Sequence, residues 1–479
     1  MKLRGIAGCG FFCFLILPLQ AQDTADRSEA ERLQKLENAV RQLQQRNSDL
    51  ESQVQQLKAK SPFAPVISGT EARVIPGNDN KTVFAAPPPP LVDVHPGGSE
   101  YKLTLGGYVQ ANFEDGDVSA FEGRFGATAL KDRFRLRRAR ISLTGDFAEQ
   151  FDFKIEGDLE QSDAAITALK SVDPATGAST TVSTGNRTQF SGTDIFINWH
   201  GIPEMNVKVG QWKAPFGLEN LTPDTLIYTI ERSLPTGAIV PERQIGAMIW
   251  GKPLATAAPD YKDFVTYYAG AFNGNGRNFN NNDNNEFLYV GRLELQPFKG
   301  QLAGQEASLK LGGDYLHSRD EAGTNISPVL NLKVNPDGSL TSFSLTSADE
   351  RNAFSFDAWL KVGPFDLIAE YLEEHVDGRA AGGVLAMADF VANGFYVQGS
   401  YFILPKKLQG VVKWEALNPG QLGNDGIHSL TAGLNYYIHS DNVKVMADYV
   451  HTWSDFREAN PQFGDSEFNE VLLRLQVIF

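Results

Sequence analysis

Hydrophobic and polar residues alternate along the last twelve residues of the chain, FNEVLLRLQVIF. One face carries Val471, Leu473, Leu475, Val477 and Phe479, and the other carries Glu470, Arg474 and Gln476, with Leu472 and Ile478 as exceptions. A strand with one apolar face, one charged face and an aromatic end is typical of a wall between lipid and water. A strand of a soluble sandwich has the same alternation, so the pattern gains weight only if it recurs upstream.

The alternation recurs throughout the chain after residue 100, where we expect strands and no helix. The predicted strands are 101–113, 137–147, 151–160, 192–200, 206–213, 244–251, 261–272, 286–298, 305–317, 352–362, 365–375, 392–403, 408–415, 428–439, 442–452 and 467–479. In 137–147, for example, Arg138 and Arg140 share one face, while Ala139 and Ile141 share the other.

The connections between these strands alternate between short turns and long loops, with 161–191 and 318–351 among the long ones. This alternation predicts an all-β fold, a sixteen-stranded antiparallel transmembrane β-barrel over 101–479. An even strand count places both barrel ends at the short-turn rim, on the periplasmic side. A tandem soluble β-protein is less favoured, because it explains neither the alternating loop lengths nor the charged face on nearly every strand.

The amino terminus has the pattern of a secretory signal peptide over residues 1–21, with a basic start and an apolar stretch from Ile6 to about Leu19. Both cysteines, Cys9 and Cys13, lie within it, so the mature chain has no disulfide, thiolate zinc site or cysteine nucleophile. Removal of Lys2 and Arg4 leaves 41 basic against 58 acidic residues, a net charge of −17. That charge argues against nucleic acid as a partner.

A heptad pattern over residues 28–60 predicts a coiled-coil helix. Leu36, Leu43, Leu50 and Leu57 alternate with Leu33, Val40, Asn47 and Val54. Such a narrow apolar stripe favours self-association over packing on a distant domain, and the Val/Asn positions lean toward two strands. A Pro-rich linker, residues 61–100, follows and includes four consecutive prolines, 87–90.

The third long connection, residues 214–243, is the candidate pore constriction. Its apolar stretch 226–230 suits a solvated external loop poorly, and folding back against the lumen wall would shelter it. Lys213 and Arg243 flank the loop and Arg232 lies within it. The loop also carries acidic residues that oppose any anion preference, namely Glu219, Asp224, Glu231 and Glu242.

Two motifs resemble those of the phosphate-selective porin O and P family: residues 209–219 (VGQWKAPFGLE), continued by 230–235 (IERSLP), and the Arg-rich 137–140. The resemblance covers roughly 101–479. It implies a sixteen-stranded barrel, usually trimeric, with an inward third loop and basic lumen residues that guide anions. The residues that match the motifs, and so carry this implied role, are Arg137, Arg138, Arg140, Lys213 and Arg232.

The chain departs from that pattern in two ways. Its predicted inward positions mix basic with acidic residues, such as Lys208 and Arg292 with Glu156 and Glu370, which favours a general aqueous pore over a tight phosphate binder. The amino-terminal rod is absent from the simplest members of the family. Salt bridging across the barrel and anion guidance remain equal interpretations of the arginine cluster.

Together these features predict an outer-membrane porin for passive diffusion of small solutes, anions such as phosphate among them. Expected partners are outer-membrane lipid, small anionic or polar solutes and two further copies in a homotrimer. The alternative is a structural anchor that tethers the membrane to peptidoglycan through the periplasmic coiled coil. The seven histidines are scattered, no Ser-His-acid set of a barrel hydrolase can be assembled, and Asn273 to Asn285 reads as a solvated loop. We therefore expect no enzyme, cofactor or metal site.

Overall fold

The computed structural model of the chain describes the sixteen predicted strands and most of their connections. The described residues are 101–117, 132–161, 188–319, 348–378 and 389–479, without 279, 281, 283, 284 and 464, together with Gln45 and the short segments 92–94, 168–172, 179–183, 332–334, 340–342, 380–381 and 384–385. The chain divides into two units, 1–75 and 76–479. The predicted signal peptide and, apart from the helical Gln45, the predicted coiled coil lie outside the described residues.

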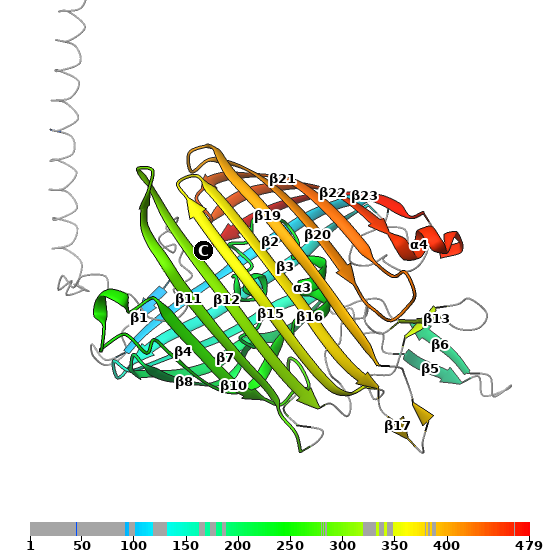
Figure 1. The fold of residues 1–479 in the computed structure, drawn as a ribbon, viewed down its shortest axis with the longest axis horizontal. Coiled ribbons are helices and arrows are strands. Elements are labelled where there is room, and N and C mark those ends of the chain that lie inside the picture. Colours follow the sequence, from blue (N-terminus) through cyan, green and yellow to red (C-terminus); the bar gives the residue numbers. More distant parts are fainter. Residues whose placement is uncertain are drawn as a thin grey trace, which may run out of the picture. The chain divides into compact units, whose positions relative to one another are not determined.

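Sixteen antiparallel strands form a closed barrel, as predicted, and their bounds differ from the predicted ones by at most four residues (Figure 1). They are β2 (Tyr101–Gly116), β3 (Arg133–Phe147), β4 (Phe151–Gln161), β7 (Thr188–Ile202), β8 (Met205–Lys213), β9 (Arg243–Gly251), β10 (Val265–Phe272), β11 (Leu288–Leu302), β12 (Gln305–Arg319), β15 (Ala348–Val362), β16 (Phe365–Gly378), β19 (Phe390–Leu404), β20 (Leu408–Asn418), β21 (Ile427–His439), β22 (Val443–Ser454) and β23 (Glu467–Ile478).

The barrel closes where the last strand pairs with the first. Residues 470–478 of β23 pair with residues 108–116 of β2. Phe479 extends this seam, because its backbone N–H donates to the Gly107 carbonyl at 3.0 Å and its carbonyl accepts from the Gly107 N–H at 2.9 Å. A side chain at Gly107 would meet the Phe479 ring, so the glycine makes this close approach possible. β1 (Val92–Val94), within the predicted linker, pairs with residues 103–105 of β2 beyond the reach of β23.

The loops 161–191 and 318–351 lie at the same rim, as predicted, because the strands between them are even in number and antiparallel. Short and long connections alternate around most of the barrel, but the connection 252–264 at the short-turn rim is longer than 419–426 at the other rim. Three of the long loops contain small hairpins: β5 (Ala168–Val172) with β6 (Ser179–Ser183), β13 (Leu332–Val334) with β14 (Leu340–Ser342), and β17 (Ala380–Ala381) with β18 (Val384–Leu385). The prediction that a strand begins at 261 was wrong. Pro259 starts the 3₁₀ helix η1 (Pro259–Tyr261), and β10 begins only at Val265.

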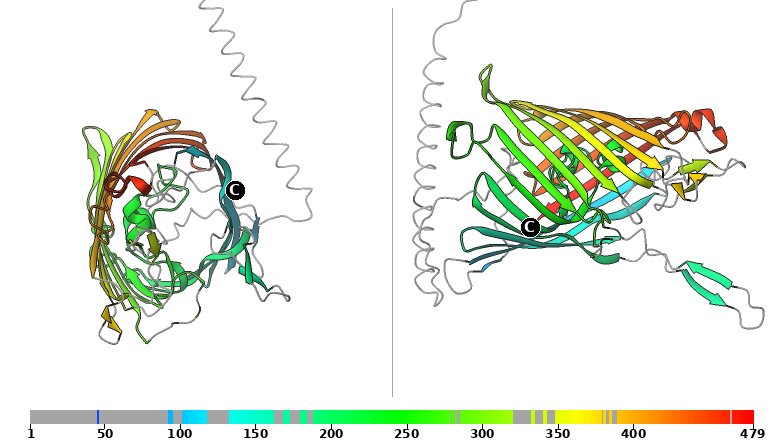
Figure 2. Two further views of the ribbon diagram at one scale, coloured as in Figure 1. Left: turned by 90° about the vertical axis from the view of Figure 1, so that its right-hand side faces the viewer. Right: turned by 60° about the horizontal axis from the view of Figure 1, so that its bottom comes forward.

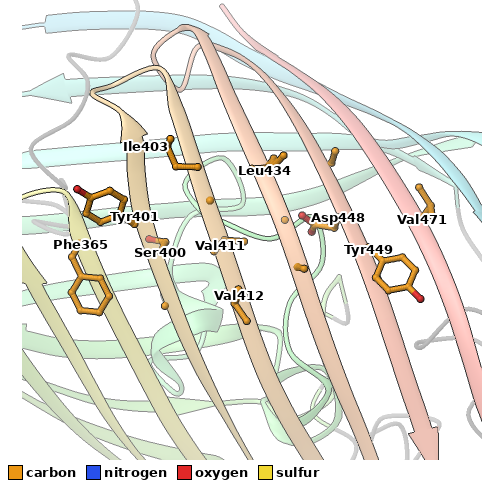
Figure 3. Close-up of a pocket in the computed structure, with 15 residues that line it drawn as sticks. Phe365, Ser400, Tyr401, Ile403, Val411, Val412, Leu434, Asp448, Tyr449 and Val471 are labelled. Carbon is orange, nitrogen blue, oxygen red and sulfur yellow. The ribbon is translucent and has the colours of Figure 1, made fainter. Parts of the chain in front are cut away.

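The outer face of the barrel is apolar and exposed, as the period-two pattern predicts. On β23, Val471, Leu473 and Leu475 are exposed, while Arg474 and the exception Leu472 are buried on the inner face. Figure 3 shows Tyr401, Val412, Leu434 and Tyr449 on neighbouring strands. They border a shallow hollow of about 770 Å³ between small residues of the wall. This hollow lies on the outer face of the barrel, away from the lumen.

The expectation of no helix after residue 100 was wrong for three short segments: α2 (Leu218–Leu221), α3 (Leu234–Ile239) and α4 (Asp455–Ala459). Each has six residues or fewer, too short to show a helical period in the sequence. A further 3₁₀ turn, η4 (Pro461–Phe463), follows α4. No helix among the described residues is long and apolar enough to span a membrane.

The connection between β8 and β9, residues 214–242, turns into the barrel, and we call it the inward loop. Figure 2 shows this green segment within the ring of strands. Its residues Phe216, Ile230, Leu234 and Ile239 are buried in a hydrophobic cluster. The wall contributes inward apolar residues to the same cluster, among them Phe272, Leu316, Ala353, Leu372, Ala392 and Met446. The inward loop therefore fills one side of the lumen with an apolar core.

Candidate pore constriction

Carboxylates of the barrel wall hold the backbone N–H groups of the inward loop. Glu370 on β16 accepts from the N–H groups of Leu218 and Glu219, at 2.8 and 3.0 Å. Glu415 on β20 accepts from Leu234 N–H at 3.0 Å, and Asp448 on β22 accepts from Ile230 N–H at 2.6 Å. These N–H groups include the first of α2 and α3, which have no partner within their own helices.

Cations and amides of the wall hold the loop carbonyls in the same way. Lys413 donates to the Glu231 carbonyl at 3.1 Å, Lys444 to the Thr225 carbonyl at 2.8 Å, and Arg474 to the Ile230 carbonyl at 2.6 Å. Gln110, Asn435 and Gln476 add further bonds to loop carbonyls. Buried backbone groups need such partners, so the wall pins the loop along most of its length.

The family-like motif residues mainly build this loop. Gly217 has a φ of 78°, a left-handed conformation that favours glycine, and its N–H donates to Asp314 at 2.8 Å. The Glu219 carboxylate accepts from the N–H and hydroxyl of Ser233, at 2.8 and 2.6 Å, and so ties α2 to the start of α3. Arg232 donates to the Glu219 and Thr222 carbonyls, at 3.0 and 2.8 Å. The motif thus carries a structural role as well as charge.

The inner face of β3 carries five arginines because a β-bulge changes the side to which residues point. Gln110 of β2 pairs with Arg138, but Ala111 pairs with Leu136, so Arg137 is the extra residue. Before the bulge, even-numbered residues such as Phe134 and Leu136 are exposed on the outer face. After the bulge, odd-numbered residues such as Ile141 are exposed there instead. The residues on the opposite face are Arg133, Arg135, Arg137, Arg138 and Arg140. We call this set the arginine face.

Asp224 of the inward loop lies at the centre of four cations. Its carboxylate is 2.5 Å from Arg232, 2.7 Å from Arg140, 3.4 Å from Arg138 and 3.7 Å from Lys213. Burial alone raises the pKa of Asp224, but these cations hold that pKa well below its usual range. Asp224 is therefore ionised, and it shares one of its four cations, Arg140, with Asp158 and Glu156 of β4.

Glu231 receives two arginines from opposite sides of the barrel seam. Arg137 of β3 binds it through two hydrogen bonds, at 2.9 and 3.0 Å, and Arg474 of β23 binds it at 3.1 Å. Burial raises the pKa of Glu231, but the two arginines lower it below the usual range of a glutamate. The two loop carboxylates thus contact six basic side chains, the four around Asp224 and these two. Arg140, one of the six, is also paired with Asp158 and Glu156 of β4, at 2.8 and 3.7 Å.

The cations of the arginine face are more exposed than the carboxylates that pair with them. The Arg133 side chain is 35% exposed and that of Arg135 is 20% exposed, against 5% for their shared partner Glu114. Outside the arginine face, Arg232 and Lys213 are likewise 15% and 16% exposed, against 3% for Asp224. The order is reversed for Arg474 and Glu231, at 0% and 16%, so the greater exposure of cations is a property of the arginine face and its neighbours rather than of the whole lumen.

Arg243 belongs to a separate ion-pair network. It donates to Asp194 of β7 at 2.8 Å, and Lys154 of β4 binds the same carboxylate at 3.1 Å. The structure thus brings five of the six predicted site residues to Asp224 and Glu231, with Arg243 near but outside that cluster. Whether these residues act on a passing solute stays a prediction.

The inward residues of the barrel differ in how far water reaches them. On β16 every second residue from Asp366 to Val376 is buried, and on β19 every second residue from Phe390 to Phe402 is buried. By contrast the side chains of Arg135, Lys154 and Asp194 on β3, β4 and β7 are 20%, 26% and 18% exposed. Glu294 on β11 and Lys361 on β15 are 20% and 21% exposed, so water also reaches inward residues in other parts of the lumen.

Three contributors were missed at the sequence level: Arg133 and Arg135 on the arginine face, and Asp224 as the centre of the cluster. The alternation from Arg133 onward was a usable signal, but the bulge at Arg137 breaks it. Asp224 was counted only as opposing charge, because nothing local in the sequence shows which cations surround it.

A closed barrel of sixteen strands with an apolar outer face, a charged lumen and an inward loop is the architecture of an outer-membrane porin. The family model described as phosphate-selective porin O and P matches residues 104–479, and the chain belongs to this family. The family and the fold indicate a channel rather than an enzyme.

Several solved structures are similar in fold. An anion-selective porin from Comamonas acidovorans is 12% identical, with 79% of this chain and 100% of that chain covered and a TM-score of 0.49. The outer-membrane channel DcaP of Acinetobacter baumannii is 14% identical, with 79% and 98% covered and a TM-score of 0.47. A loop-deletion mutant of OmpT, an outer membrane protein of Vibrio cholerae, is 11% identical, with 79% and 100% covered and a TM-score of 0.49. Comparison with curated proteins gives no match.

Proposed function

We propose that the protein is a passive diffusion channel of the outer membrane with a modest preference for small anions. The observation that carries this proposal is the exposure difference on the arginine face, 35% and 20% for Arg133 and Arg135 against 5% for Glu114. Ion preference depends on the charges that water and solute reach along the pore.

The net charge of the chain does not oppose this preference. Charges on exposed loops are screened over about 8–10 Å at physiological salt, whereas charges beside a narrow, partly dry passage are screened much less. Asp224 and Glu231, together with Asp158 and Glu156 beside Arg140, offset most of the positive charge of the six basic side chains that contact the loop carboxylates. A modest preference is therefore expected rather than exclusion of cations.

The solute class is small hydrated anions, with inorganic phosphate as the first to test because the family model carries that description. The lumen also holds carboxylates such as Glu156 and Asp194 beside Lys154. This mixture favours weak, transient contacts over tight binding of one anion, and a channel must release what it binds.

The short-turn rim faces the periplasm in this proposal, and the protein assembles as a homotrimer through its barrels. Both barrel ends lie at that rim, so the amino-terminal segment would begin on the periplasmic side. Native mass spectrometry of the intact protein tests the assembly, and a purely monomeric spectrum contradicts it.

Planar-bilayer recording in asymmetric KCl tests the anion preference. The wild-type reversal potential is expected on the anion side, and Arg135→Glu should move it toward cations. Arg319→Glu is the matched control, because it changes the net charge by the same amount at a site away from the arginine face. Arg319 lies at the long-loop end of β12, and its side chain is 54% exposed. If both variants behave alike, the arginine face is structural only and the anion preference falls.

A further inference from the structure

A second cavity, about 220 Å³ in volume, lies beneath the inward loop at the short-turn rim. The loop contributes Leu226 and Tyr228, and the wall contributes Phe402 near the end of β19 and Tyr437 near the end of β21. The two adjoining turns complete it with Lys406, Ser440 and Asp441. The cavity is therefore separate from the arginine face, which begins at the long-loop rim with Arg133.

Aromatic rings dominate the wall of this cavity. The Phe402 and Tyr437 ring centroids are 5.5 Å apart, and both side chains are buried. The Tyr437 hydroxyl donates to Gln409 at 2.6 Å, and the Tyr228 hydroxyl donates to Asp366 at 3.2 Å. Gln409 and Asp366 do not line the cavity, so both hydroxyls are engaged elsewhere and the tyrosines offer mainly ring carbon to a ligand.

The charges around the cavity leave one cation without a described partner. Asp441 is balanced, because Lys444 lies 3.3 Å from its carboxylate. Lys406 is exposed in the turn between β19 and β20, and no carboxylate of the described residues lies within 4.0 Å of its ammonium group. A cation beside an apolar, ring-lined cavity complements a ligand with an anionic end and a flat apolar body.

We propose that this cavity binds a small aromatic carboxylate, with its ring against Phe402 and Tyr437 and its carboxylate paired to Lys406. The volume equals that of about seven water molecules, which suits one ring with a carboxylate rather than a larger ligand. A hydrated phosphate gains nothing from ring carbon, so the ligand class differs from that proposed for the lumen. A millimolar affinity is expected, since a channel subsite must release its ligand.

Benzoate is the probe, and saturation-transfer NMR on the full-length protein in detergent measures its binding. Benzoate should saturate the site, whereas acetate, which lacks the ring, and benzyl alcohol, which lacks the charge, should bind more weakly. Lys406→Gln should weaken benzoate about fivefold, the upper end for an exposed ion pair. Lys407→Gln is the matched control, because the neighbouring Lys407 does not line the cavity, and Lys406→Arg should retain binding.

A second pair of variants tests the ring. Tyr437→Leu should weaken benzoate about tenfold, while Tyr437→Phe, which keeps the ring and loses only a hydroxyl engaged elsewhere, should bind normally. Heat-modifiable migration on a gel verifies that each barrel is folded. Equal benzoate binding by Lys406→Gln and Lys407→Gln, or acetate binding as tight as benzoate, would overturn the proposal. Binding is measured without conduction, so this site and the anion preference of the pore can fail separately.

Discussion

Arg137 and Glu231 join the barrel wall to the inward loop through two parallel hydrogen bonds, from Nε to Oε1 at 2.9 Å and from Nη2 to Oε2 at 3.0 Å. Arg474 donates to the same Oε1 from the other side of the seam, at 3.1 Å. Arg137 lies on β3 and Arg474 lies on β23, and both strands pair with β2, one on each side. Strands on the two sides of β2 thus hold the same loop carboxylate. The closure of the barrel and the position of the loop are thereby coupled.

This shared carboxylate predicts non-additive effects on stability. Either Arg137→Gln or Arg474→Gln leaves Glu231 with one arginine, so each should lower the free energy of unfolding by about 1–3 kcal/mol. The double variant leaves the carboxylate with neither arginine and should cost more than the sum of the two single changes. Urea unfolding of the four proteins in micelles measures the coupling, and strict additivity would show that the two pairs are independent.

Replacement of Asp224 should affect both stability and selectivity. Asp224→Asn removes the carboxylate that four cations share, and loss of a buried partner typically costs about 3–5 kcal/mol. The same change adds positive charge to the lumen, so the reversal potential should move further toward anions. Glu242→Gln is the matched control, because Glu242 is an exposed carboxylate of the same loop. A shift toward cations, or a stability equal to that of the control, would contradict this role.

The ion pairs of Asp224 should persist in acid. A carboxylate with a depressed folded-state pKa contributes its full stability above its unfolded pKa, about 4 for an aspartate, and loses that stability progressively as pH falls from there to the folded value. The cations hold the pKa of Asp224 well below its usual range. The stability difference between wild type and Asp224→Asn should therefore be the same at pH 7 and at about pH 5, and should shrink as pH falls below about 4. A difference that does not change down to about pH 2 would show that the pKa of Asp224 is not depressed.

Replacing Gly217 by alanine should destabilise the protein more than replacing Gly237, the second glycine of the inward loop. Gly217→Ala places a β-carbon on a left-handed residue and 3.0 Å from the Glu370 carboxylate that caps α2, which should cost about 1–2 kcal/mol. Gly237 lies in α3 without a left-handed φ, so Gly237→Ala should be neutral or slightly stabilising. Thermal unfolding compares the two, with single-channel noise as a readout of loop mobility. Equal effects would mean that the backbone of Gly217 is not restrictive.

The strands were predictable because each one separates two environments. Lipid on one side and the charged lumen on the other impose a period of two on each strand. The outward Ile141 is therefore apolar and the neighbouring inward Arg140 is charged, and this alternation is visible in the sequence. The bulge at Arg137 breaks this regularity, and so Arg133 and Arg135 were not assigned to the lumen. A bulge depends on how two strands pair, which one strand alone does not reveal.

The inside of the lumen was less predictable for the same reason. Phe216, Leu234 and Ile239 form an apolar core with wall residues from distant strands, and these contacts follow no local period. The prediction of no helix failed at α3, whose six residues are stabilised by the Ser233 cap and by Glu415 on β20. The conformation of α3 thus depends on a contact between residues about 180 positions apart in the sequence. The predicted coiled coil lies outside the described residues and stays a prediction.

The pairing of β23 with β2 has a consequence for the order of assembly. The strand that closes the ring, β23, also carries Arg474, which binds the Ile230 carbonyl of the inward loop. A ring in which β23 has not yet paired with β2 therefore has both an open edge and a loop without one of its anchors. Pairing between strands so far apart in the sequence forms slowly. Ring closure and loop anchoring are then completed by the same slow pairing, and without it the barrel remains an open sheet.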